Sequence, residues 1–82
     1  LNQGYYLYVG RLVKYKKVDL LIDTFNELGL PLVVVGTGSE SYSLKHKAYG
    51  NIKFLENVSD DELAKVYLGA KAFIMPQEED FG

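Results

Sequence analysis

Four short apolar runs divide the chain, and the stretches between them have helical patterns. The runs cover residues 5–9, 32–35, 51–55 and 72–75. They are rich in β-branched and aromatic residues and too short to form stable isolated helices, so we predict four strands. The second is a continuous β-branched run, which is typical of a strand buried on both faces of a parallel sheet. Strands alternating with helices predict an α/β fold with a doubly wound parallel sheet.

Three helices are expected between these strands. Residues 18–28 place apolar side chains on one helical face, and Gly29 follows the last of them. A second, short helix is weakly periodic, and we interpret Ser39 as its N-cap. The third begins with a capping box, formed by Ser59 and the glutamate three positions later, Glu62.

The connections predict the strand order and the place of a binding site. Right-handed crossovers in a doubly wound sheet favour the order 3-2-1-4, with the sheet truncated after the fourth strand. Ligands of such sheets bind beyond the carboxyl ends of the strands, where the winding reverses. We therefore expect a crevice between the first and fourth strands, lined by residues 10–17 and 76–82.

Composition excludes several classes of protein. The 82 residues carry 9 Lys and Arg against 11 Asp and Glu, a net charge of −2, which disfavours nucleic acid as a partner. The absence of cysteine excludes disulfides, thiolate metal sites and thiol nucleophiles. The length suits one domain or part of one. No apolar run approaches the roughly 20 residues that span a bilayer, so we expect a soluble protein, with attachment to a membrane surface left open. The one histidine, His46, lacks partners for zinc or a catalytic triad and is interpreted as a surface residue.

Basic residues concentrate after the first strand. Arg11, Lys14, Lys16 and Lys17 account for four of the nine basic side chains and directly precede a predicted helix. Guanidinium, ammonium and the free amides of a helix N-terminus all favour anions, so a diphosphate is the expected ligand. Tyr15 lies within this segment and could pack against the ligand. A solvated basic loop is the alternative that the charge run leaves open.

Two further segments carry weaker signals. The acidic residues 78–80 could accept hydrogen bonds from sugar hydroxyls or hold a divalent cation, or they could form a polar loop tip. Gly36 and Gly38 resemble the start of a dinucleotide fingerprint, but they follow the second strand instead of the first. A tight turn between strand and helix is the structural interpretation of these glycines.

The motifs form a recognisable ordered set. Gly-Arg-Leu-Val-x-x-Lys begins at Gly10, Val-Val-x-Gly-x-Gly ends at Gly38, Ser-Asp-Asp-Glu-Leu begins at Ser59, and Pro-x-x-Glu-Asp-Phe-Gly ends at Gly82. With these motifs the chain resembles the retaining glycosyltransferases of family 4, especially their mannosyltransferase-like branch. The resemblance implies that residues 1–82 are part of the Rossmann-like, nucleotide-sugar-binding domain of a GT-B enzyme, without its N-terminal acceptor domain.

The resemblance also implies roles for single residues. Arg11 and Lys16 match the positions that bind the donor diphosphate, and Glu79 matches the first Glu of a Glu-x7-Glu motif, which approaches the donor sugar. The second Glu of that motif would fall outside the chain. Lys17 stands where the family often has glycine. The further donor-binding positions implied are Gly10, Gly36, Gly38, Asn57, Val58, Asp80, Phe81 and Gly82.

The implied reaction transfers a sugar from a nucleotide diphosphate donor to an acceptor hydroxyl with retained anomeric configuration. Neither a metal nor another cofactor is expected. Mannose from GDP-mannose is the expected donor, and a polysaccharide or glycolipid the expected product. A glycan or lipid-linked acceptor would bind through the absent domain, in the cytoplasm or at the inner face of the membrane. The alternative is a non-catalytic α/β module that binds a phosphorylated ligand or a protein partner.

Overall fold

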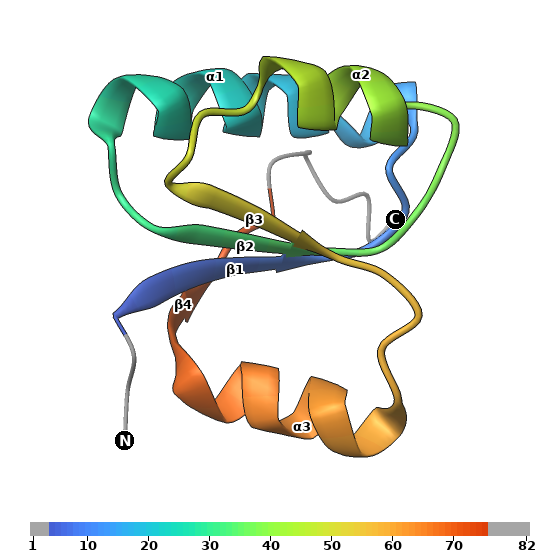
Figure 1. Cartoon of the computed structure of the whole chain (residues 1–82), viewed down its shortest axis with the longest axis vertical. Helices are drawn as coiled ribbons and strands as arrows, with labels where there is room; N and C mark the ends of the chain where they lie inside the picture. Colours follow the sequence, from blue (N-terminus) through green and yellow to red (C-terminus); the bar gives the residue numbers. More distant parts are fainter. Residues whose placement is uncertain (1–3, 76–82) are drawn as a thin grey trace, which may run out of the picture.

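One parallel sheet organises the molecule. The structure, a computed structural model, describes residues 4–75. Its strands are β1 (Tyr5–Val9), β2 (Leu32–Val35), β3 (Ile52–Leu55) and β4 (Ala70–Phe73). They are parallel and lie in the order β3-β2-β1-β4, as Figure 1 shows. The predicted fold class and strand order are therefore confirmed.

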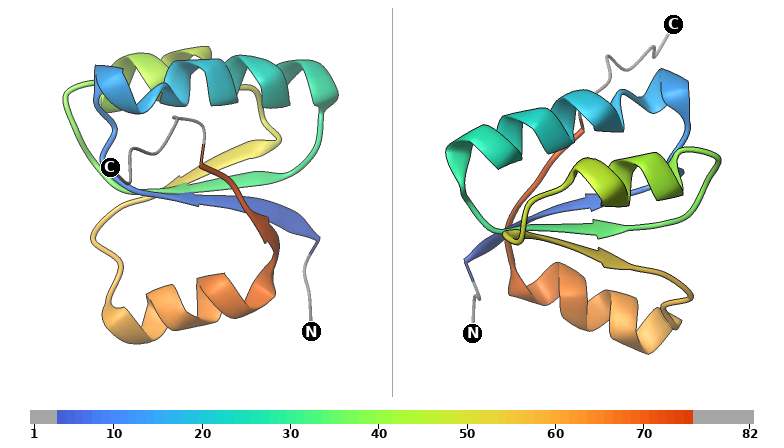
Figure 2. Two further views of the ribbon diagram at one scale, coloured as in Figure 1. Left: turned by 180° about the vertical axis from the view of Figure 1, so that it is seen from behind. Right: turned by 45° about the horizontal axis from the view of Figure 1, so that its top comes forward.

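Helices cover both faces of this sheet. The elements are a short 3-10 helix, η1 (Lys14–Lys16), and the α-helices α1 (Val18–Leu28), α2 (Ser41–Lys47) and α3 (Asp60–Gly69). Helices α1 and α2 lie side by side on one face, and α3 lies on the other (Figures 1 and 2). The winding thus reverses between β1 and β4, at the predicted switch point.

The main hydrophobic core lies between the sheet and the α1/α2 layer. Helix α1 buries the apolar face that its spacing predicts, with Ile22 at 0% exposure. Side chains alternate along β1, so that Tyr6 and Tyr8 join this core. The Tyr6 ring packs against Phe25 with ring centroids 5.4 Å apart. This layer holds β1 and the loop that follows it firmly in place.

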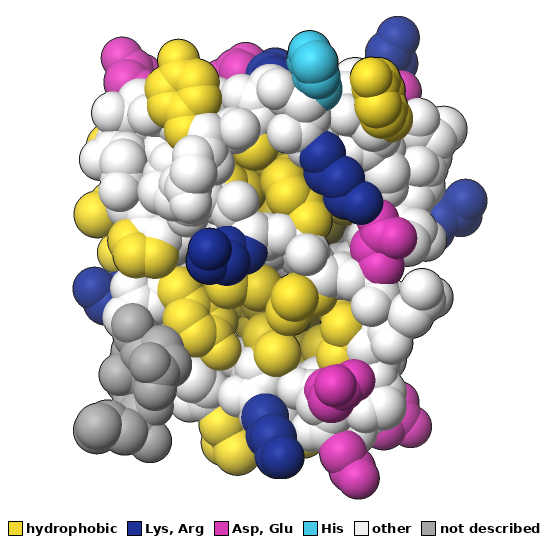
Figure 3. Space-filling model, viewed as in Figure 1, with side chains coloured by type: hydrophobic (Ala, Val, Ile, Leu, Met, Phe, Trp, Pro, Cys, Tyr) yellow, Lys and Arg dark blue, Asp and Glu magenta, His cyan; other side chains and the backbone are white. Residues whose placement is uncertain are grey.

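The opposite layer is more open. Within α3, Gly69 is the buried residue. The hydroxyl of Tyr5 donates to the backbone oxygen of Val66 at 2.7 Å, and the rings of Tyr67 and Phe73 meet 5.7 Å apart. Figure 3 shows hydrophobic side chains gathered and visible between the sheet and α3.

Several predicted boundaries are wrong. Strand β3 begins at Ile52, one residue later than expected, and β4 ends at Phe73, two residues earlier than expected. The fourth strand begins at Ala70, two residues earlier than expected, because the chain passes from α3 into β4 without a loop. A Cβ on Gly69 would lie 2.6 Å from the Tyr5 hydroxyl, so this close crossing depends on glycine. The capping box of Ser59 and Glu62 is confirmed.

The predicted N-cap of α2 is also wrong. The N-cap is Glu40 instead of Ser39, and no side chain caps this helix. The Glu40 amide donates to the backbone oxygen of Leu12, and this long-range bond fixes where α2 begins.

Candidate functional site

Backbone hydrogen bonds join the loop after β1 to the loop after β2. The Gly10 amide donates to the oxygen of Val35 at 3.0 Å, and the Leu12 amide donates to the oxygen of Thr37 at 2.9 Å. The oxygen of Leu12 in turn accepts from the Glu40 amide at 2.8 Å. The backbone on both sides of Arg11 is therefore fixed at the carboxyl end of β1.

Two glycines allow this close approach. A Cβ on Gly36 would come closer than 3.0 Å to the oxygen of Gly10, and one on Gly38 would do the same to the oxygen of Leu12. The φ of Gly36 is 144°, a conformation that other residues rarely adopt. The tight-turn interpretation of these glycines is confirmed. The donor contacts implied for them, and for Gly10, stay predictions.

Tyr8 supports the turn from within the core. Its hydroxyl donates to the backbone oxygen of Arg11 at 2.9 Å, although only 4% of the residue is exposed. A Cβ on Gly10 would lie 2.7 Å from this hydroxyl, so glycine leaves room for it. Burial, with a smaller contribution from Tyr15, raises the pKa of Tyr8 above its usual value. The sequence interpretation of Tyr8 as packing missed this hydrogen bond, although an inward tyrosine signals a polar partner.

The predicted anion-binding side chains lie on this fixed loop. Arg11 is exposed, and Lys16 is half-buried in η1, with its Nζ 5.4 Å from the centroid of the Tyr15 ring. Tyr15 is 65% exposed and available to a ligand. Among residues 4–75, the ion pairs join Lys45 to Glu56 and Lys47 to Asp23, so neither Arg11 nor Lys16 is neutralised by a described carboxylate.

Lys17 links η1 to α1 in a left-handed conformation. Its φ is 59° and its ψ 32°, and its amide donates to the backbone oxygen of Lys14 at 3.1 Å. Glycine adopts this conformation without strain, which gives a physical reason for the glycine often found at this position in the family that the chain resembles. The charge of Lys17 is incidental to this backbone role.

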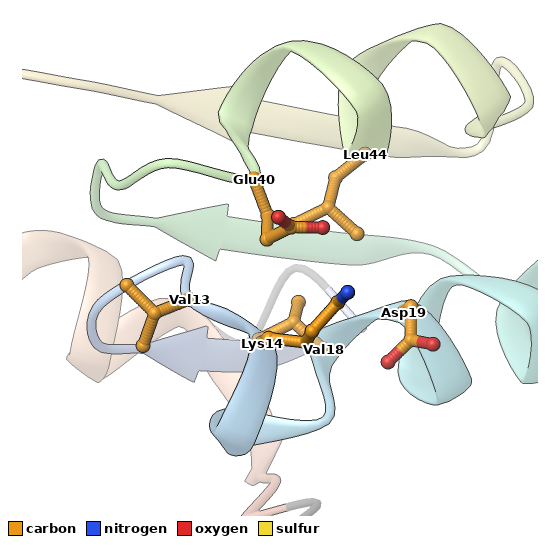
Figure 4. Close-up of a pocket in the computed structure, with 6 residues that line it drawn as sticks. All are labelled: Val13, Lys14, Val18, Asp19, Glu40 and Leu44. Atoms are coloured by element: carbon orange, nitrogen blue, oxygen red, sulfur yellow. The ribbon is translucent and has the colours of Figure 1, made fainter.

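A small hollow lies between the starts of α1 and α2. It has a volume of about 40 Å³, and Figure 4 shows Glu40, the N-cap of α2, and Leu44 of α2 on one side of it, with Lys14 and Val18 on the other. This volume is far below that of a nucleotide. The hollow is therefore not the donor pocket.

A larger groove lies at the carboxyl end of β3. Its volume is about 490 Å³, within the range of small-molecule sites. Asn57 and Val58, the residues implied to lie near the base, are among those that line it, together with Glu62 and Lys65 of α3. Asn57 has a φ of 55°, which asparagine tolerates better than most residues. The structure thus places both predicted residues beside a groove of suitable size.

The whole chain matches one sequence family. Residues 1–82 match the family described as "Glycosyl transferases group 1". The chain belongs to the group 1 glycosyltransferases. This membership confirms the resemblance at the level of the family, whereas assignment to family 4 and to its mannosyltransferase-like branch stays a prediction.

Several relatives of this group 1 glycosyltransferase are glycogen synthases. The glycogen synthase of Thermotoga petrophila is 41% identical over 81 residues, an alignment covering 83% of this chain and 16% of that protein. Those of Mycoplasma mobile and Desulfitobacterium hafniense are 31% identical over 77 residues and 30% over 76, with the same coverage. The chain thus spans about a sixth of the length of these relatives.

Part of the predicted donor site lies outside the described residues. Glu79, Asp80, Phe81 and Gly82, together with the rest of residues 76–82, belong to this part. Their expected contacts with the donor sugar therefore stay predictions for this glycosyltransferase.

The remaining sequence predictions concern metals and membranes. Within residues 4–75, no group of three or more His, Asp or Glu side chains could hold a metal ion. His46 is exposed, as expected, and stacks on Tyr42 with ring centroids 5.9 Å apart. None of the described helices has the length and apolar character needed to cross a membrane.

Proposed function

We propose that this group 1 glycosyltransferase chain forms part of the donor site of an enzyme that transfers a sugar from a nucleotide diphosphate to an acceptor hydroxyl, with retained anomeric configuration. The observation that carries the proposal is the fixed loop after β1. It presents Arg11 and Lys16, unpaired by described carboxylates, beside the switch point of a doubly wound sheet.

The proposed chemistry follows from the charge of the leaving group. As the bond between the sugar and the diphosphate breaks, negative charge grows on the diphosphate oxygens. Arg11 and Lys16 would stabilise this charge, and the fixed backbone around Arg11 means that little reorganisation is needed during the reaction. Loss of one such group raises a barrier by roughly 2.7–4 kcal/mol in comparable oxyanion sites. Glu79 would approach the donor sugar, and we expect no metal to be required.

The groove beside Asn57 and Val58 supports a place for the base. Strands β1 and β3 are separated by β2, so the basic loop and this groove lie about 10 Å apart along the sheet edge. A single nucleoside diphosphate can extend over such a distance. We infer that the diphosphate occupies the β1 loop and the nucleoside reaches toward the β3 groove.

Two donor sugars are candidates. The resemblance of the motifs implies mannose from GDP-mannose, but none of the comparisons supports that choice. The names of the relatives favour glucose instead, because glycogen is a polymer of glucose. We propose a hexosyl donor, with glucose favoured by the relatives.

The acceptor belongs to the same proposal. We infer that it is a glycan or a lipid-linked sugar bound by a further domain, as the donor half of a two-domain enzyme requires. A cytoplasmic protein with peripheral association at the inner face of the membrane remains part of this proposal. Nucleic acid is not a proposed partner, because the net charge is −2.

A transfer assay tests the proposed function. The full-length protein is incubated with GDP-mannose, UDP-glucose or ADP-glucose and a glycan acceptor mixture, and release of the nucleotide is followed. We expect turnover of one donor, reduced at least 100-fold by Lys16→Ala and unchanged by Lys53→Ala, which removes an exposed charge on β3. Donor binding without transfer would favour the non-catalytic module, and equal turnover by Lys16→Ala would remove Lys16 from the mechanism.

A further inference from the structure

We propose that Tyr8 is a positioning residue, which fixes the peptide unit of Arg11 so that the guanidinium meets the donor diphosphate. The inference rests on the proposed function, because it assigns Tyr8 a task only if Arg11 binds a diphosphate. Its basis is the 2.9 Å hydrogen bond from the Tyr8 hydroxyl to the backbone oxygen of Arg11.

The location of this bond makes it specific for Arg11. Gly10 and Leu12, on either side, are tied to the loop after β2 by their own backbone hydrogen bonds. The oxygen of Arg11 instead accepts from a side chain that rises out of the core. The Arg11 oxygen and the Leu12 amide belong to one planar peptide unit. Removal of the Tyr8 hydroxyl would leave the Leu12 bond in place and release only the carbonyl side of that unit.

Packing holds the Tyr8 hydroxyl in position. The residue is 4% exposed and belongs to the core between the sheet and the α1/α2 layer. Gly10 lies beside the hydroxyl end of the ring, where any larger side chain would meet the hydroxyl. The enclosed Tyr8 hydroxyl has little freedom to form a hydrogen bond with another group. It therefore connects the core to the backbone of the exposed Arg11.

Tyr5 provides a matched control on the same strand. Its hydroxyl also donates to a backbone oxygen, that of Val66, at 2.7 Å. Tyr5→Phe therefore removes the same kind of bond from β1, but on the α3 face and away from Arg11. Val66 lines the β3 groove, so any effect of Tyr5→Phe on the ligand would appear at the nucleoside and not at the diphosphate.

The experiment compares affinities of the full-length protein for ADP, UDP and GDP with those for adenosine, uridine and guanosine. We expect Tyr8→Phe to weaken binding of the preferred diphosphate by roughly two- to tenfold and to leave binding of the nucleoside unchanged. Tyr5→Phe should leave the ratio of the two affinities unchanged. Thermal unfolding of both variants checks that they remain folded.

A double-mutant cycle separates positioning from general stability. In an Arg11→Ala background, Tyr8→Phe should cause no further loss of diphosphate affinity, because the side chain that it positions is gone. Two outcomes would overturn the role of Tyr8 and leave the proposed function of the loop standing. One is an equal loss of diphosphate affinity on Tyr8→Phe in both backgrounds. The other is no loss on Tyr8→Phe in the wild-type background while Arg11→Ala weakens binding. If Arg11→Ala leaves diphosphate binding intact, the proposed function of the loop fails together with this inference.

Discussion

The backbone of Gly36 faces the carbonyl oxygen of Gly10 so closely that a Cβ on Gly36 would come within 3.0 Å of that oxygen. These residues follow two neighbouring parallel strands, β2 and β1. At this contact the loop that carries Arg11 packs against the loop that follows β2. The geometry of the candidate site therefore depends on a residue with no side chain.

Gly36→Ala should strongly destabilise the β1–β2 region. The substitution forces an L-residue into a φ of 144° and pushes its methyl group into the backbone of Gly10. The combined cost of strain and overlap is roughly 3 kcal/mol or more. Hydrogen exchange of the β1 and β2 amides in the full-length protein measures the loss.

Gly50→Ala is the control for this substitution. Nothing lies within 4 Å of a Cβ at Gly50, and this glycine does not have a positive φ. We expect its exchange rates to match those of the wild type. Similar protection of β1 in Gly36→Ala and Gly50→Ala would contradict the close-approach account.

Lys17→Gly should stabilise the start of α1. Lys17 has a φ of 59°, a conformation that costs a non-glycine residue roughly 1–2 kcal/mol. Glycine removes this strain, but it also gives the unfolded chain more conformational entropy, which offsets part of the gain. A net gain of about 0.5–1 kcal/mol is expected. Lys14→Gly removes the same charge within η1, where φ is not positive, and should destabilise. Slower amide exchange in the first turn of α1 for Lys17→Gly, and faster exchange for Lys14→Gly, would agree with this account.

The capping box makes the start of α3 sensitive to acid. Hydrogen bonds from the backbone amide and side chain of Ser59 hold the pKa of Glu62 below its ordinary value of 4.5. Because the pKa is lower in the folded state, the stabilisation is present above pH 4.5 and is lost as the pH falls through the lowered pKa.

Glu62→Gln should remove this acid dependence, since the amide can still accept from Ser59 but does not titrate. Asp61→Asn is the matched control, and it should retain the acid-induced opening caused by Glu62. Amide exchange at the α3 N-terminus, corrected for its intrinsic pH dependence, provides the comparison. An identical acid response in Glu62→Gln and the wild type would show that Glu62 does not control the helix start.

The strand order could be predicted because local pattern and general topology agree. The β-branched run at residues 32–35 required a position inside the sheet, and the alternating run at 51–55 suited an edge. The start of α2 could not be predicted in this way. It depends on the bond between Glu40 and Leu12, which are far apart in the sequence and meet only in the folded chain.

The charged residues of the candidate site could be predicted from the sequence, but the backbone contacts that position them could not. The charge of Arg11 and Lys16 and their place after the first strand are visible in the sequence. The left-handed turn at Lys17 and the hydrogen bond from Tyr8 depend on backbone geometry, which a charge pattern does not encode. The inward tyrosine was the available signal, since its buried hydroxyl needs a partner.

The central claim is that the fixed loop after β1 binds the diphosphate of a nucleotide donor. Calorimetric titration of GDP, UDP and ADP into the full-length protein and its Arg11→Ala/Lys16→Ala double variant tests it most directly. Lys53→Ala/Lys71→Ala removes the same number of charges from exposed positions on β3 and β4 and serves as the control. The account predicts saturable binding of one nucleotide to the wild type and the control, lost in the Arg11/Lys16 double variant. Undiminished binding by that variant, or no binding of any of the nucleotides by the folded wild type, would contradict it.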